Sequence, residues 1–348
     1  MGKSAIIAVV GVLLLLSGCT AVGYYGQAVS GHMKIMHAAR PIQELQQDPA
    51  TDPALKEKFS HVIAIRDFAS RELALPDNGS YRSYADLGRP FVVWNVFAAP
   101  EFSVEPEKWC MAVVGCVNYR GYFDRAEAER YAAELKNAGL ETHVGGVAAY
   151  STLGYFDDPV LNTFLRLGNI EAARIIFHEL AHQLLFVKGD TVFNESFATA
   201  VEQEGMQRWF ARNSQHEQHK TYLAQQKRKD QFVQLVESYR SKLRALYASG
   251  KPQDEMRRAK AETLADMKRA YAVLKQSWDW DSRYDKWFEQ DLNNAKIASQ
   301  ALYTQLLPAF EALLEQEGRD LPRFYRRVQT LAKQTKEERL AALNMLVK

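Results

Sequence analysis

Residues 175–183 have the sequence IIFHELAHQ, and this segment constrains the chain more strongly than any other. Its two histidines are four positions apart, so on an α-helix their side chains project from one face, one turn from each other. Two imidazoles in this arrangement suit a tetrahedral zinc ion. Glu179 lies at the edge of such a site, where its carboxylate can take a proton from metal-bound water. The segment therefore predicts a zinc site with His178 and His182 as ligands and Glu179 as general base.

Glu195 supplies the third ligand that this prediction needs, because a HExxH pattern alone also arises by chance. It lies in the segment NESFA at residues 194–198, beyond a turn that contains Gly189. A helix, a short turn and an antiparallel helix can bring Glu195 back against the two histidines. Two His and one Glu leave a position for water, as in catalytic zinc sites, whereas structural sites have four protein ligands. We therefore expect one Zn²⁺ ion per chain, bound by His178, His182 and Glu195.

Three further carboxylates are candidates for roles around the metal ligands. Glu202 lies seven positions after Glu195, hence on nearly the same helical face. It could orient a ligand histidine or bind the α-ammonium group of a substrate, or it could be a buried carboxylate that pairs two helices. Asp190 could also support a ligand, or it could cap the following helix. Glu204 is a second candidate for binding the α-ammonium group.

Two tyrosines just before the predicted metal-binding helix are candidates for the group that stabilises the oxyanion in catalysis. These are Tyr150, at the end of a predicted strand over residues 142–151, and Tyr155, just after it. Tyr119, Arg120 and Tyr122 are further candidates of the same kind. Each of them could equally be a packing residue, because tyrosine is common in cores and at their margins.

The N-terminal residues predict export and lipidation. The apolar run at residues 5–16 is typical of a signal peptide and is too short to span a bilayer, which needs about 20 residues. The sequence LSGC at residues 16–19 resembles the bacterial lipobox, in which the cysteine is acylated. We therefore expect a signal peptide at 1–18, a lipid on Cys19, and a tether at 19–40 that holds the protein on the outer membrane, facing the periplasm. A short transmembrane anchor with an incidental cysteine is the alternative.

Cys110 and Cys116 are the other two cysteines of the chain. An exported protein meets an oxidising environment, where such a pair tends to form a disulfide, here closing a small loop. Two buried free thiols are the alternative. A metal site is disfavoured, because the spacing is not CxxC and no histidine lies nearby in the sequence.

The pattern of elements predicts an α+β fold that is mostly helical. Residues 41–168 combine helical periodicity with β-rich runs such as PFVVWNVFA at 90–98, which indicates a small sheet in an α/β substrate-binding subdomain. The pattern of residues 169–348 predicts the two metal-site helices, followed by long, charged C-terminal helices that each carry an apolar stripe.

Composition argues against a nucleic-acid partner. The 348 residues carry 44 Lys and Arg against 42 Asp and Glu, a formal net charge of +2. A balance this close to neutral lacks the basic footprint that a nucleic-acid-binding surface needs. We therefore expect a peptide or protein substrate, and contact with the membrane through the lipid on Cys19.

The motifs together resemble a known family. HELAH followed by NESFA resembles the gluzincin pattern, in which an Asn-Glu pair at a helix start supplies the third zinc ligand. With YADLGRPFVVWNVFAAPEFS (84–103), WCMAVVGCVNYRGYF (109–123) and VAAYSTLGYFDDPVL (147–161), the chain resembles the family of bacterial lipoprotein aminopeptidases. The resemblance implies a zincin-like fold and zinc-dependent peptide hydrolysis, with aminopeptidase as the activity. The interval between HELAH and NESFA is shorter than in thermolysin-like enzymes, so the connection between the two helices must be trimmed.

Two alternatives to an aminopeptidase stay open at this stage. An endopeptidase would use the same metal site in a cleft that is open at both ends. A non-hydrolytic envelope lipoprotein would use zinc structurally and act in assembly or interaction, with the charged helices after Asn213 as its partner surface.

Overall fold

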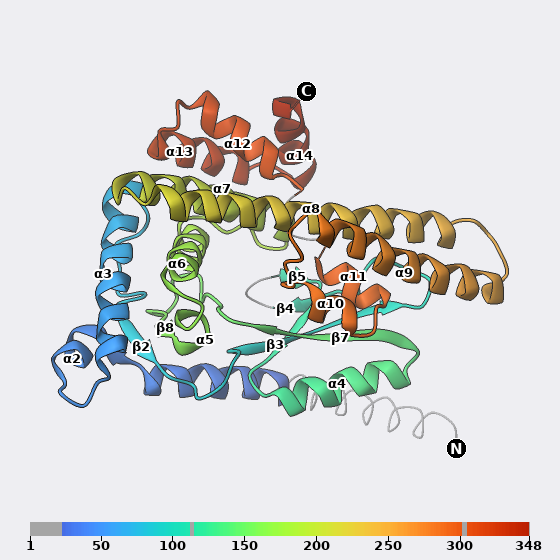
Figure 1. Cartoon of the computed structure of the whole chain (residues 1–348), viewed down its shortest axis with the longest axis horizontal. Coiled ribbons are helices and arrows are strands. Elements are labelled where there is room, and N and C mark those ends of the chain that lie inside the picture. Colours follow the sequence, from blue (N-terminus) through green and yellow to red (C-terminus); the bar gives the residue numbers. More distant parts are fainter. Residues whose placement is uncertain (1–22, 112–114, 301–304, 348) are drawn as a thin grey trace, which may run out of the picture.

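The computed structural model describes residues 23–111, 115–300 and 305–347. The fold is α+β and mostly helical, as the sequence predicts, and its small sheets lie in the N-terminal half (Figure 1). The predicted signal peptide and Cys19 lie outside the described residues. Within the described ranges, no helix has the length and apolar character that crossing a membrane requires. The predicted subdomain boundary at residue 168 stays a prediction.

The N-terminal part of the fold consists of helices around a short three-stranded sheet. A helix over residues 23–38 precedes these elements: β1 (Arg40–Pro41), α2 (Ile42–Gln47), α3 (Pro53–Leu73), β2 (Ser83–Ala85) and β8 (Val160–Leu161). α3 begins where the Asp52 side chain accepts hydrogen bonds from two backbone N–H groups of the first turn. The strand order is β1-β2-β8, and β2 and β8 are parallel, which brings residues near 81 and 158 together.

A second sheet lies between two helices. It contains β6 (Arg120–Tyr122), β3 (Val93–Pro100) and β7 (Leu140–Val147) in that order, with both pairs antiparallel. Alternate residues of β3 point to opposite faces. Trp94 and Val96 pack against α4 (Arg125–Asn137), and Phe97 packs towards α11 (Asn294–Gln300). The sheet therefore joins the N-terminal and C-terminal parts of the chain.

The predicted disulfide between Cys110 and Cys116 is confirmed. It joins β4 (Trp109–Met111) to β5 (Gly115–Val117), which form an antiparallel pair. Gly115 has a φ of +82°, and a Cβ there would lie 2.8 Å from the backbone nitrogen of Gly189. The hairpin thus packs directly against the turn that follows the HELAH helix.

The central helix pair is α6 (Asn169–Leu184) and α7 (Thr191–Arg212), which pack on α3 and follow the short α5 (Asn162–Leu165). Phe177 and Phe197 are fully or almost fully buried in this core. Gly205 of α7 permits the close approach of the helices, because a Cβ there would lie 2.8 Å from the Phe177 ring and 2.7 Å from the Leu73 side chain.

The C-terminal helices cover α7 and extend to one side (Figure 1). α8 (His216–Tyr247) and α9 (Gln253–Gln276) pack together, and Phe232, Trp278 and Phe288 form a separate apolar core with α10 (Asp285–Glu289). The chain ends with α12 (Leu307–Gln316), α13 (Leu321–Ala332), α14 (Lys336–Asn344) and a short 3₁₀-helix (Met345–Val347). Phe310 of α12 packs against Phe197 of α7, with ring centroids 6.0 Å apart.

We predict that Gly205→Ala destabilises the fold, because the added methyl group must displace the buried Phe177 ring. Overpacking of this kind costs about 1–3 kcal/mol, which exceeds the gain of up to ~1 kcal/mol in helix propensity. Chemical denaturation measures the free energy of unfolding. Gly26→Ala is the matched control, since Gly26 is also helical and a Cβ there meets nothing within 4 Å. Equal or greater stability of Gly205→Ala would contradict the prediction.

Candidate metal centre and active site

The structure brings the three predicted ligands together. The Nε2 atoms of His178 and His182 are 3.2 Å apart. The Glu195 carboxylate lies 3.3 Å from the first of these nitrogens and 3.6 Å from the second. Among the described residues, these His and Glu atoms form a group that could hold a metal ion, all within 4.8 Å of one another. The donors are two imidazoles and one carboxylate, which is the set found at catalytic zinc sites.

The turn between α6 and α7 sets the position of Glu195. Gly189 adopts a φ of +77° in this turn, a conformation that favours glycine. The Asn194 side chain accepts a hydrogen bond from the N–H of Val187 at 2.7 Å and donates one to its carbonyl at 2.8 Å. Asn194 therefore closes the turn on itself, which explains how so short a connection returns Glu195 to the histidines.

Asp190 acts on the same turn from the start of α7. Its carboxylate accepts from the N–H of Phe193 at 3.4 Å and pairs with Arg339 of α14 at 2.7 Å. The capping role anticipated from the sequence is therefore present. No contact between Asp190 and a ligand histidine appears among the described residues, so its support of the ligands is indirect.

Glu202 is the direct partner of a ligand histidine. It is 2% exposed, and its carboxylate lies 3.0 Å from the Nδ1 of His178 and 3.1 Å from the guanidinium of Arg174. Burial alone would raise the pKa of Glu202, but Arg174 and His178 together lower it to about 2. An ionised Glu202 fixes the His178 ring and directs its Nε2 towards Glu195.

The two histidines differ in their electrostatic environment. Burial would lower the pKa of His178, but hydrogen bonds to Glu195 and Glu202 raise it to about 10. Burial lowers the pKa of His182 to about 4, and its buried Nδ1 has no hydrogen-bond partner among the described residues. The carboxylates around His178 thus favour a positive charge at this site, which a proton or a metal cation can supply.

Glu179 lies on the same helix with an environment suited to proton transfer. Burial raises the pKa of Glu179 to about 7; the His178 charge opposes this shift and the Glu195 charge adds to it. A carboxylate whose pKa lies near neutrality can both accept and release a proton.

A comparison with known families agrees with this geometry. A family described as "Putative aminopeptidase" matches residues 23–343, which is most of the chain. The chain belongs to this aminopeptidase family. No curated protein and no solved structure gives a significant match. The family resemblance read from the motifs is therefore confirmed, while its zincin and lipoprotein features stay predictions.

Two tyrosines share this region of the fold with the carboxylates. Burial raises the pKa of Tyr119, and the charges of Glu195 and Glu179 raise it further. Burial and the charge of Glu179 likewise raise the pKa of Tyr81, whose buried hydroxyl has no hydrogen-bond partner among the described residues. Tyr81 was missed by sequence reasoning, because it lies far from HELAH in the chain. The only hint in the sequence was the turn signal PDNGS at residues 76–80, which directly precedes Tyr81.

Tyr150 and Tyr155, which the sequence predicts as oxyanion-stabilising residues, lie in different environments from Tyr81 and Tyr119. The Tyr150 hydroxyl lies 2.6 Å from the Nδ1 of His32, and its ring packs against Phe123. Tyr155 is 74% exposed. Their predicted role stays a prediction, as does that of Tyr119, and the structure adds Tyr81 as a candidate.

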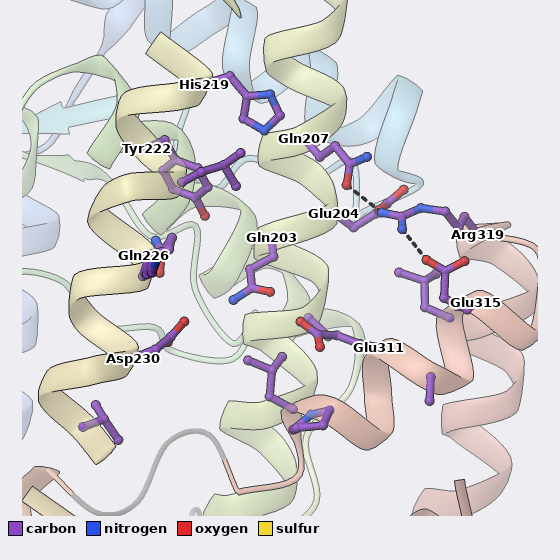
Figure 2. Close-up of a pocket in the computed structure, with 18 of the residues that line it drawn as sticks. Gln203, Glu204, Gln207, His219, Tyr222, Gln226, Asp230, Glu311, Glu315 and Arg319 are labelled. Carbon is purple, nitrogen blue, oxygen red and sulfur yellow. Dashed lines mark hydrogen bonds and ion pairs between the residues drawn. The ribbon is translucent and has the colours of Figure 1, made fainter. Parts of the chain in front are cut away.

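Glu204 lies on a different face of α7 from the metal ligands. It lines a hollow of about 890 Å³ between α7, α8 and α12, where it lies beside Arg319 (Figure 2). Its carboxylate pairs with Arg319 and, at 2.7 Å, with Arg208. Glu204 is therefore already neutralised and is unsuited to binding an ammonium group at the metal centre.

We predict that Glu202→Gln weakens metal binding, because the neutral amide no longer holds His178 in its ligating orientation. Loss of such a partner typically lowers metal affinity about 10–100-fold. Competition with a chromophoric chelator measures the Zn²⁺ dissociation constant. Glu204→Gln is the control, since it makes the same change at a similarly buried position of α7. Equal losses in both variants would mean that α7 is generally perturbed and would count against a specific role of Glu202.

Proposed function

We propose that this member of the aminopeptidase family is a zinc metallopeptidase with His178, His182 and Glu195 as metal ligands. The observation that carries the proposal is the convergence of their three ligand atoms within 4.8 Å. Zinc bound there would act as a Lewis acid on the substrate carbonyl and lower the pKa of water towards about 7. The donor set leaves room for that water, as a catalytic site requires.

Glu179 performs the proton transfers in the proposed mechanism. In its ionised form it accepts a proton from the water that attacks the scissile carbonyl carbon. It then gives this proton to the nitrogen of the leaving amine as the peptide bond breaks. The partly apolar surroundings that raise the pKa of Glu179 to about 7 favour both halves of this cycle.

Other groups of the chain hold the reacting atoms in place. Glu202 keeps the His178 ring oriented from behind, with Arg174 neutralising its charge. The hydroxyl of Tyr119 is suited to donate a hydrogen bond to the carbonyl oxygen as negative charge develops on it. Tyr119 keeps its proton at neutral pH, because its environment raises its pKa.

The proposal places the enzyme in the bacterial cell envelope, attached to the outer membrane by a lipid on Cys19. The sequence LSGC at residues 16–19 is its main support. The disulfide between Cys110 and Cys116, both of which are exposed, also fits an oxidising compartment outside the cytoplasm.

We predict that Glu179→Gln removes turnover without removing the metal. General acid–base catalysis contributes about 10²–10⁴-fold, so kcat on a peptide library should fall at least a hundredfold. Mass spectrometry of the native protein should still show one zinc ion per chain. Glu171→Gln, on the same helix but in its first turn, should retain activity. Turnover retained by Glu179→Gln would exclude this residue as the base, and absence of turnover in the wild type would favour the non-hydrolytic alternative.

We also predict that cleavage requires a free N-terminus. An aminopeptidase binds the α-ammonium group, so N-acetylation should abolish cleavage of a peptide that is cut when unmodified. Liquid chromatography with mass spectrometry on matched free and acetylated peptides measures the difference. Equal cleavage of both forms would identify an endopeptidase instead.

A further inference from the structure

Buried polar atoms without hydrogen-bond partners gather on one side of Glu179. Within the described part of the chain, they include the Oδ1 of Asp158, the hydroxyl of Tyr81 and the Nε2 of His32. Buried polar atoms are almost always hydrogen bonded in folded proteins. Three unpartnered atoms in one region therefore indicate that the region is built to receive a polar ligand or water.

Hydrogen bonds and charges connect these three residues with one another. The N–H of Tyr81 donates to the carbonyl oxygen of Asp158 at 2.7 Å. His32 lies 2.6 Å from the hydroxyl of Tyr150, whose pKa is raised by burial and by the Asp158 charge. The charges of Asp158 and Tyr150 also act on Tyr81. The three residues thus form one connected group, which we call the Asp158 cluster.

The Asp158 cluster faces the same side of α6 as Glu179. The Ser80 hydroxyl accepts a hydrogen bond from the Asp158 N–H at 3.3 Å and one from the Gln183 side chain at 3.1 Å. Gln183 lies four residues after Glu179 and hence one turn along the same helical face. Consistent with this, the charge of Asp158 contributes to the raised pKa of Glu179.

Asp158 differs from the other buried carboxylates of the described residues in having no cationic partner. Those carboxylates are Asp190, which pairs with Arg339; Glu202, which pairs with Arg174; and Glu204, which pairs with Arg208 and Arg319. Asp158 is 3% exposed, and its second oxygen accepts from the N–H of Thr152 at 2.9 Å. Burial raises the pKa of Asp158 to about 6 in spite of that hydrogen bond. A cationic ligand would stabilise its ionised form.

We propose that the Asp158 cluster binds the free α-ammonium group of a peptide substrate, an inference that rests on the proposed peptidase function. An ammonium group has three N–H donors, and the cluster offers three unpartnered acceptors in Asp158, Tyr81 and His32. His32 is an acceptor at Nε2 when its Nδ1–H is donated to Tyr150. Burial lowers the pKa of His32 and so keeps the ring neutral.

The segment over residues 151–157 covers one side of the Asp158 cluster. Ser151 and Thr152 hold the Asp158 carboxylate, and the Phe156 ring lies 4.5 Å from the His32 ring, centroid to centroid. Tyr155 and Phe156 are themselves exposed, so few buried contacts hold this segment in place.

The test compares Asp158→Asn with the wild type on matched free and N-acetylated peptides. The amide keeps the shape and the hydrogen bond from Thr152 but removes the charge. We expect KM for the free peptide to rise about tenfold or more, with a much smaller change in kcat, because a charged hydrogen bond to the ammonium group is lost. Asp157→Asn, the same change at the exposed neighbouring position, should leave KM unchanged. A KM for Asp158→Asn equal to that of the wild type overturns the inference.

A binding measurement separates this inference from the proposed function. Calorimetry with zinc-loaded Glu179→Gln protein compares leucinamide, which has a free α-ammonium group, with N-acetyl-leucinamide. We expect only leucinamide to bind, and we expect its affinity to fall about tenfold or more when Asp158→Asn is added. Tyr81→Phe should weaken binding without destabilising the fold, because its hydroxyl is unpartnered. If the wild type shows no turnover but leucinamide still binds, only the peptidase proposal is contradicted. Equal binding of both amides would overturn the ammonium site.

Discussion

The proposed metal centre depends on one electrostatic constraint, which is that two carboxylates, the buried Glu202 and the half-buried Glu195, contact the same histidine. Glu195 and Glu202 lie on opposite sides of the His178 ring, and Arg174 neutralises only the second of them. A proton on His178 can supply the missing positive charge, with its Nε2–H facing both Glu195 and the Nε2 of His182. A divalent cation bound there would contact Glu195 and both ring nitrogens together. Such binding would stabilise the packing of α6 on α7 as well as supply the proposed chemistry.

The other charges of α7 are neutralised by the C-terminal helices. Arg339 of α14 pairs with Asp190 at the start of α7, and Arg319 pairs with Glu204 further along. An unpaired buried charge costs several kcal/mol, so each pair fixes α7 relative to a C-terminal element. The C-terminal helices thus have a structural role in holding Glu195 and Glu202, whatever partner surface they also offer. The family match likewise includes these helices, since it extends to residue 343.

Sequence reasoning succeeded where the signal is local. The i, i+4 spacing of His178 and His182 is a property of any helix, and a short return to Glu195 has few possible paths. Asp158 and Tyr81 carry no such signal. They meet because β2 and β8 pair in parallel, with Tyr84 opposite Val160. Strands of two or three residues are too short for periodicity to reveal their pairing, so this part of the site could only be found in three dimensions.

The short turn between α6 and α7 must be rigid, because any movement there shifts Glu195 away from the histidines. Three contacts from different parts of the chain meet this requirement: the Asn194 side chain bonded to Val187, the Asp190–Arg339 pair, and the Gly115 backbone against Gly189. The last contact comes from the disulfide-closed hairpin, and only glycine permits so close an approach of two backbones. A longer connection could have spread the same restraint over many weak contacts. The short connection instead depends on three strong restraints: the Asn194 side chain, the Asp190–Arg339 ion pair and the disulfide-closed hairpin. All three restraints can be understood as consequences of the short turn between α6 and α7.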